Sequence, residues 1–186
     1  MIDPNNITNY YRTKQELEEF WLFCIMVAGK KSTVVANKLS DLLAYVTCPF
    51  DFLKQLDKEG SLEIHLKHHK VGQYNRITNA IRDSFNVNLR SASFYDLIKI
   101  RGCGLKTASF FLLHSRGEEH VVLDTHVLAY LRDNGVDAPK STPQSNLKYS
   151  ELAKKFQEIS NKEFPEMSLA ERDLTIWKSR SHKTNV

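Results

Sequence analysis

An amine and a carboxylate that could carry out covalent chemistry stand eighteen residues apart, Lys106 and Asp124. An uncharged lysine amine is a nucleophile, and a nearby carboxylate can take up protons and stabilise positive charge on a substrate. Taken singly, a lysine at a helix start is usually a solvated cation, and an aspartate before THVLAYL is usually an N-cap. A helix of about 15 Å after residue 105 and a return segment of up to about 30 Å allow the two residues to meet. The pair therefore predicts a nucleophile, Lys106, with Asp124 as its proton partner.

Lys106 follows a glycine turn between two apolar segments, LIKIRGCGLKTASFFLL. Glycine at positions 102 and 104 lets the backbone turn tightly, so that amide groups at the start of the next helix can face an anion. Positive charge flanks this turn at Lys99, Arg101 and Lys106. A G-x-G pair alone can be no more than a tight turn between helices. The complete pattern of apolar residues, glycines, a small residue and flanking cations favours a DNA phosphate as the anion.

The elements that must position these residues are helices. A T-x-x-E capping box at Thr13 and Glu16 opens a helix that runs to Gly29. An S-x-x-D box at Ser93 and Asp96 opens the short helix before the glycine turn. Only EEHVVLD has strand character, and its apolar run is too short for a sheet. The apolar periodicity elsewhere predicts an all-α protein of about nine or ten short helices.

The composition permits a polyanionic partner without requiring one, because the net charge is +4 and the isoelectric point is near 8.9 in 186 residues. The three cysteines, Cys24, Cys48 and Cys103, lie far apart, which argues against a zinc or iron–sulfur site and against disulfides. The N-terminus has no basic and apolar leader, and no apolar run approaches the length of a membrane span. We expect a monomeric, cytoplasmic protein that contacts no membrane.

The stretch LIKIRGCGLKTASFFLLHSRGEEHVVLDTHV resembles the helix-hairpin-helix (HhH-GPD) DNA glycosylase superfamily, with Lys106 and Asp124 at the positions of the catalytic lysine and aspartate. GQYNRITNAI resembles the helix before the hairpin, and FWLFCIMVAGKKSTVVANKLSDLL resembles an early helix pair whose loop reaches into the DNA. The chain is most similar to endonuclease III and to archaeal-type 8-oxoguanine glycosylase-lyases without an iron–sulfur cluster. The resemblance extends from about residue 15 to about residue 177.

The resemblance implies two helical lobes within one HhH-GPD unit, residues 1–186, with the active site in the cleft between the lobes. The central lobe is expected at residues 30–115 and contains the hairpin, residues 97–112. The second lobe is expected to combine residues 1–29 with residues 116–186.

The activity that the resemblance implies is base-excision repair, in which a damaged base, first of all an oxidised purine such as 8-oxoguanine, is removed from duplex DNA. Lys106 attacks C1′ and forms a Schiff base, Asp124 shuttles protons, and β-elimination then nicks the strand. Two alternatives stay open. One is a monofunctional glycosylase for another modified base, in which Lys106 merely contacts phosphate. The other is a non-catalytic hairpin module that only binds DNA.

The residues expected to contact DNA are Lys99, Arg101, Gly102, Gly104, Thr107, His126, Gly29, Lys30 and Lys31. Candidates for the wall of the base pocket are Trp177, Met26 and Phe23, although a plain core role is the stronger alternative for Met26 and Phe23. No cofactor is expected and no cysteine follows Cys103, but the resemblance implies a monovalent cation at the hairpin carbonyls. The histidines of HLKHH lack ligand partners, so no metal site is expected.

Overall fold

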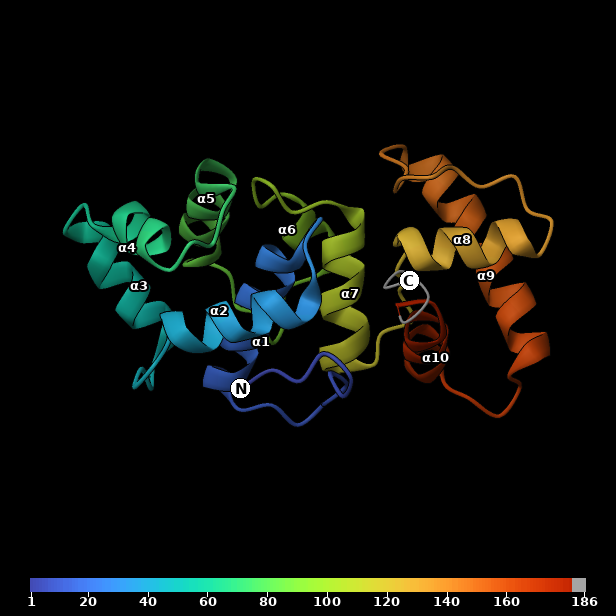
Figure 1. The fold of residues 1–186 in the computed structure, drawn as a ribbon, viewed down its shortest axis with the longest axis horizontal. Helices are drawn as coiled ribbons and strands as arrows, with labels where there is room; N and C mark the ends of the chain where they lie inside the picture. Colours follow the sequence, from blue (N-terminus) through green and yellow to red (C-terminus); the bar gives the residue numbers. More distant parts are fainter. Residues whose placement is uncertain (182–186) are drawn as a thin grey trace. The chain divides into compact units, whose positions relative to one another are not determined.

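A computed structural model describes residues 1–181 of the chain (Figure 1). These residues form ten α-helices and no β-strand, which confirms the all-α prediction. The chain divides into two compact units, Met1–Cys103 and Gly104–Val186, so the boundary falls inside the glycine turn. None of the helices in the described part is long and apolar enough to cross a membrane.

The first unit contains six helices and is built around the first of them. They are α1 (Lys14–Val27), α2 (Ser32–Leu42), α3 (Pro49–Lys58), α4 (Leu62–His68), α5 (Tyr74–Ser84) and α6 (Phe94–Ile98). Helix α1 packs against α2, α3 and α5, and every residue from Phe20 to Met26 is at most 1% exposed. The indole Nε1 of Trp21 donates a 2.7 Å hydrogen bond to Oγ of Ser84, so its one polar atom is satisfied. Burial of each large apolar side chain stabilises such a core by roughly 1.5–3 kcal/mol.

The helix-end signals in the sequence are confirmed. At the start of α1, Thr13 Oγ1 accepts from the Glu16 amide at 3.3 Å, and the Glu16 carboxylate accepts from the Thr13 amide at 2.7 Å. Ser93 and Asp96 form the same reciprocal pair at the start of α6. Helix α1 ends just before Gly29, whose φ is +71°. These devices involve residues three apart, which is why the sequence alone reveals them.

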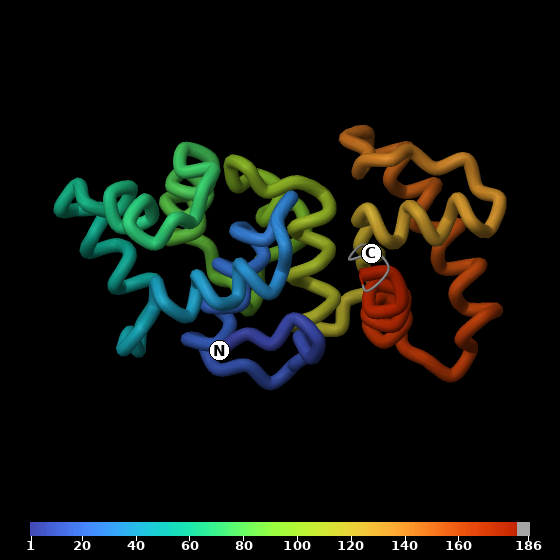
Figure 2. The backbone as a smooth tube through the Cα atoms, in the orientation of Figure 1, coloured from blue at the N-terminus to red at the C-terminus, as the bar shows by residue number. Residues whose placement is uncertain are grey.

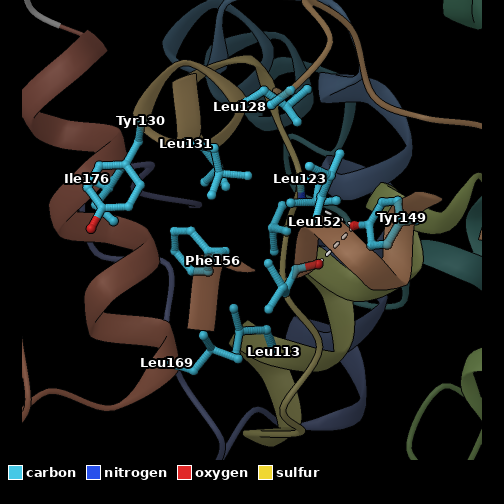
Figure 3. Close-up of a cluster of buried hydrophobic side chains, with 14 of the residues drawn as sticks. Leu113, Leu123, Leu128, Tyr130, Leu131, Tyr149, Leu152, Phe156, Leu169 and Ile176 are labelled. Atoms are coloured by element: carbon cyan, nitrogen blue, oxygen red, sulfur yellow. Dashed lines mark hydrogen bonds between the residues drawn. The ribbon is translucent and has the colours of Figure 1, made fainter. Parts of the chain in front are cut away.

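The second unit contains four helices around one apolar core. They are α7 (Leu105–Arg116), α8 (Thr125–Asp133), α9 (Asn146–Glu163) and α10 (Leu169–Ser181). Figure 3 shows that all four helices contribute to the core, among them Leu113, Leu131, Phe156 and Ile176. The rings of Tyr130 and Phe156 meet edge to face, 5.8 Å apart. Lys106 lies in the first turn of α7, and Asp124 is the N-cap of α8. The shared core therefore also positions the backbone that carries the predicted amine and carboxylate.

The predicted lobes divide the chain differently. The prediction groups residues 1–29 with residues 116–186, whereas α1 packs inside the first unit. A helix that is apolar on nearly all sides needs neighbours on several sides, and α2, α3 and α5 supply them. The lobes and the cleft between them stay predictions. Residues 182–186 lie outside the part of the chain that the structure describes.

Candidate active site

Asp124 is the N-cap of α8. Its Oδ1 atom accepts hydrogen bonds from the amides of His126 at 2.9 Å and of Val127 at 2.8 Å. The ordinary explanation of this aspartate as a helix cap is therefore confirmed. Both bonds end on Oδ1, and no residue in the range 1–181 donates to Oδ2. One carboxylate oxygen thus holds the side chain in place while the other stays available for a proton.

The segment between α7 and α8 is irregular backbone, as Figure 2 shows, and it is anchored directly before the capping carboxylate. The amide of Leu123 donates to the Tyr149 hydroxyl at 3.1 Å, and its carbonyl accepts from Thr142 Oγ1 at 2.7 Å. The Tyr149 hydroxyl in turn donates to the Val121 carbonyl at 2.8 Å (Figure 3). Burial raises the pKa of Tyr149 to about 12, so the hydroxyl remains a donor at neutral pH. Two side chains distant in the sequence, Tyr149 and Thr142, therefore hold this short segment through three hydrogen bonds in place of a sheet.

Lys106 lies in the first turn of α7 and is half-buried. Its amine forms no hydrogen bond or ion pair with any residue in the range 1–181. Its charge does act on Asp124, where it favours the ionised carboxylate. Burial and then the negative charge of Asp173 act more strongly in the opposite direction, so the pKa of Asp124 is raised. The structure thus brings the predicted amine and carboxylate within electrostatic reach, and the carboxylate has an increased affinity for a proton.

The turn between α6 and α7 depends on Gly102. Its φ is +78°, a conformation that residues with a side chain rarely adopt, and a Cβ here would lie 2.5 Å from Cγ of Arg76. Arg76 donates to the Gly102 carbonyl at 3.0 Å and to the Ile25 carbonyl at 2.8 Å, which ties the turn to the end of α1. Sequence reasoning missed Arg76, because nothing in GQYNRITNAI distinguishes it from a solvated arginine.

Gly104 is the N-cap of α7, and its situation differs from that of Gly102. Its backbone is extended, with φ −97° and ψ 179°, which any residue can adopt. Nothing lies within 4 Å of the place where a Cβ would be. The fold of the chain therefore does not require glycine here, whereas a ligand that approaches the first amides of α7 would.

Most of the chain matches a known family, since the family model described as 8-oxoguanine DNA glycosylase matches residues 5–164. The chain belongs to the 8-oxoguanine DNA glycosylase family. A curated protein of Methanocaldococcus jannaschii, named 8-oxoguanine DNA glycosylase/AP lyase, is 26% identical over 194 aligned residues, which cover 98% of this chain and 90% of that protein. No solved structure matches the chain at a significant level.

The two hairpin cations that are predicted to bind DNA, Arg101 and Lys99, have different partners in the structure of this glycosylase. Arg101 binds Asp83 through two nitrogens, Nε at 2.8 Å and Nη2 at 2.7 Å. Lys99 is more loosely paired, with its amine 3.6 Å from Asp96, and remains largely exposed. Their contacts with DNA stay predictions, and a phosphate that binds Arg101 must compete with a carboxylate.

The turn between α1 and α2 contains the other predicted DNA contacts of this glycosylase. The amine of Lys30 donates to the Val71 carbonyl at 2.8 Å, and burial together with neighbouring positive charges lowers its pKa to about 8. Lys31 is exposed at the N-cap of α2, and Gly29 is exposed at the end of α1. Lys30 is thus partly engaged in holding the following loop, whereas Lys31 faces solvent; a DNA contact at this turn stays a prediction.

The candidates for the base pocket fall into two groups. Phe23 and Met26 are each 1% exposed in the core of the first unit, which agrees with the alternative core role. Trp177 on α10 is half-buried, and its ring meets that of His126 edge to face at 6.4 Å. Thr107, expected at the DNA, is buried in the same helical turn as Lys106. Trp177 is therefore the one of the three candidates that retains surface for a base.

Sequence reasoning missed two buried polar residues of the second unit, His114 on α7 and Asp173 on α10. Nε2 of His114 lies 3.1 Å from Oδ2 of Asp173. The sequence contained a signal for His114, because this histidine directly follows the apolar run FFLL and a buried polar group needs a partner. The sequence could not identify that partner, Asp173, because it lies 59 residues further along the chain.

The monovalent cation at the hairpin carbonyls stays a prediction; the Gly102 carbonyl already accepts a hydrogen bond from Arg76. The Ile100 carbonyl accepts the Cys103 amide at 3.0 Å. Among residues 1–181 no group of three or more histidines, cysteines or acidic residues could hold a metal ion.

Proposed function

We propose that this glycosylase removes 8-oxoguanine from duplex DNA and then cleaves the strand as an AP lyase, with Lys106 as its nucleophile. The observation that carries the proposal is the amine of Lys106, which has no ion-pair partner in residues 1–181 and lies within reach of the charge on Asp124. Membership of the family supports the substrate class. The name of the M. jannaschii relative, 8-oxoguanine DNA glycosylase/AP lyase, supports the combination of both activities.

The first step is the transfer of a proton from Lys106 to Asp124. An ammonium cannot attack carbon, and only about one amine in 2,500 is neutral at pH 7 when a lysine has its usual pKa. Oδ2 of Asp124 accepts the proton, since the helix cap uses Oδ1. The raised pKa of Asp124, caused by burial and by Asp173, favours this transfer.

The second step is the loss of the base. The neutral amine of Lys106 forms a bond to C1′ while the bond from C1′ to the base breaks, and the electron pair of that bond leaves with the base. Protonated Asp124 gives its proton to the departing base. The carboxylate is then negative again beside the new positive charge on the nitrogen, which it stabilises.

The third step opens the sugar and cleaves the strand. The nitrogen bonded to C1′ loses a proton to Asp124, the bond from C1′ to the ring oxygen breaks, and that oxygen takes the proton. The product is a Schiff base between Lys106 and C1′. The carboxylate of Asp124, which has passed its proton to the ring oxygen, then takes a proton from C2′, and the electron pair of that bond expels the 3′ phosphate by β-elimination. The enzyme remains covalently attached until water hydrolyses the Schiff base.

DNA binding is assigned to the hairpin and the start of α7. Gly104 supports this assignment, because the open space at its missing Cβ leaves the first amides of α7 accessible to a phosphate. The damaged nucleotide must leave the base stack before its C1′ can reach Lys106. Trp177, half-buried beside His126, is proposed as a wall for the extruded base. We further propose that the enzyme is a monomer and acts on duplex DNA in the cytoplasm.

A covalent-trapping experiment tests the proposal. Wild type is incubated with a duplex that contains a single 8-oxoguanine, borohydride is added, and adducts and nicked strands are resolved on a denaturing gel. We expect an adduct and a nick with wild type and neither with Lys106→Gln. Asp124→Asn should slow base release by about 100-fold or more. Lys140→Gln, which removes an exposed lysine from the same unit, is the matched control and should behave as wild type.

The same experiment separates the alternatives. Base release that survives Lys106→Gln but not Asp124→Asn would show a monofunctional glycosylase. Binding without base release or adduct, on 8-oxoguanine and on an abasic site, would show a module that only binds DNA. An adduct with another lesion but not with 8-oxoguanine would retain the chemistry and change the substrate.

A further inference from the structure

A buried hydrogen bond joins α7 to α10 within the second unit. His114 and Asp173 are 0% and 5% exposed, and Nε2 of the imidazole lies 3.1 Å from Oδ2 of the carboxylate. Placing a carboxylate away from water is unfavourable unless hydrogen bonds or charges compensate it. Neither residue donates or accepts the proton in the chemistry proposed above, so their place in the core calls for another explanation.

Asp173 is on a helix that packs against both helices of the proposed site, and its charge acts on Asp124. Helix α10 packs against both α7 and α8, the helices whose first turns adjoin Lys106 and Asp124. The groups that act electrostatically on Asp124 come from four helices: Lys106 from α7, His126 from α8, Tyr149 from α9 and Asp173 from α10. Of these four, Asp173 is the one with the same charge as Asp124.

We propose that Asp173, held by His114, is a positioning residue that makes Asp124 the acceptor of the proton from Lys106. The inference rests on the proposed function, because it explains how that proton transfer becomes favourable. Two carboxylates close together repel each other when both are ionised, and a proton that arrives on one of them relieves the repulsion. Asp124 can receive it because its Oδ2 is not used by the helix cap and its charge interacts with that of Lys106.

His114 has a distinct part in this arrangement. The proposal requires a negative charge on Asp173, and an ionised carboxylate only accepts hydrogen bonds, so in this arrangement the imidazole N–H of His114 is the donor. This bond compensates the burial of Asp173 and fixes the direction in which its charge faces. Since His114 is on the same helix as Lys106, the bond also couples the position of that charge to the helix that carries the nucleophile.

Nuclear magnetic resonance of the DNA-free protein tests the coupling directly. The carbon-13 signals of aspartate carboxyl groups are followed as the pH changes, and the Asp124 signal is identified by its loss in Asp124→Asn. We expect the Asp124 midpoint to lie above the ordinary aspartate value in wild type and to fall by about one pH unit in Asp173→Asn. Asp137→Asn, which removes an exposed carboxylate from the same unit, should leave it unchanged.

Single-turnover base excision supplies the second readout. The acid limb of the pH–rate profile should move to lower pH by about one unit in Asp173→Asn, and the maximal rate should fall by about tenfold. Asp173→Glu, which keeps the charge, should return the acid limb toward its wild-type position. A merely structural role would reduce the rate by one factor at every pH and would leave the limb in place.

A second neutral variant keeps the test usable if Asp173→Asn does not fold. Asp173→Ser also removes the charge beside Asp124, and the Asp124 midpoint should fall in it by a similar amount. An Asp124 midpoint that stays unchanged when the charge of residue 173 is removed would overturn the proposal. Wild type that releases no base and forms no adduct would instead overturn the proposed function, while the magnetic resonance measurement would still decide whether the two carboxylates are coupled.

Discussion

Arg101 and Asp83 form a two-nitrogen ion pair, with Nε at 2.8 Å and Nη2 at 2.7 Å from the carboxylate oxygens. The backbone amide of Arg101 also donates to this carboxylate, at 3.0 Å, so the pair ties the hairpin to α5. The side-chain hydrogen bonds from Arg101 lower the pKa of Asp83 to about 2. Asp83 is therefore ionised at every pH at which DNA binding is measured, and it competes with phosphate for the guanidinium.

Replacement of Asp83 by asparagine should strengthen DNA binding. The change releases the charge of Arg101 and removes a negative charge beside the hairpin, so we expect about a threefold to tenfold lower Kd at low salt and a salt dependence steeper by about one phosphate contact. Fluorescence anisotropy over a range of salt concentrations measures both. Asp57→Asn, which breaks the similar ion pair with Arg82, is the control. Unchanged or weaker binding in Asp83→Asn would exclude Arg101 from the DNA contact.

Alanine at the two glycines of the turn should give opposite results. Gly102→Ala places a side chain at φ +78° and 2.5 Å from Cγ of Arg76, so we expect a loss of about 1–3 kcal/mol in the free energy of unfolding. Gly104→Ala should leave stability nearly unchanged, because its backbone is extended and its Cβ meets nothing, but should weaken DNA binding. Urea unfolding and anisotropy measure the two effects. Full DNA affinity in Gly104→Ala would remove the argument that a phosphate approaches this helix end.

Loss of the Tyr149 hydroxyl should impair both stability and catalysis. Tyr149→Phe leaves the Leu123 amide and the Val121 carbonyl without this partner in a buried segment, which should cost about 1–3 kcal/mol. Base excision should slow by about tenfold, since the backbone directly before Asp124 loses an anchor. Tyr130→Phe removes another hydroxyl of the same unit, bonded to Glu163, and should affect stability without affecting the rate. Equal rates in the two variants would contradict this role.

The stability contributed by Lys30 should increase with pH. Its pKa of about 8 in the folded protein lies below the unfolded value of about 10.4, so the unfolded chain binds more protons between these values. The free energy of unfolding of wild type should therefore rise relative to Lys30→Met as the pH goes from 8 to 10. Urea titrations at several pH values measure this difference, with Lys31→Met as the control for the neighbouring exposed lysine. A difference that stays constant from pH 7 to pH 10 would contradict the prediction.

The local parts of the fold could be predicted because they depend on neighbours in the chain. The boxes at Thr13 and Ser93 involve partners three residues away, and the buried helix α1 follows from its unbroken apolar sequence. The grouping of helices into compact units could not be predicted in the same way, because it depends on which apolar faces meet. The core role of Phe23 was likewise one of two alternatives, and only its complete burial favours one of them.

The sequence by itself determined the helical class and the glycine hairpin, and it predicts that Lys106 and Asp124 act together. Residue type and spacing carry that information, since a nucleophile, a carboxylate and a turn are all local chemical signals. Only the tertiary structure decided that Arg101 faces Asp83, that Asp173 binds a partner 59 residues away and that its charge acts on Asp124. The physical reason is that the charge and proton affinity of a buried group depend on what packing places beside it, and packing joins residues whose separation in the chain carries no signal.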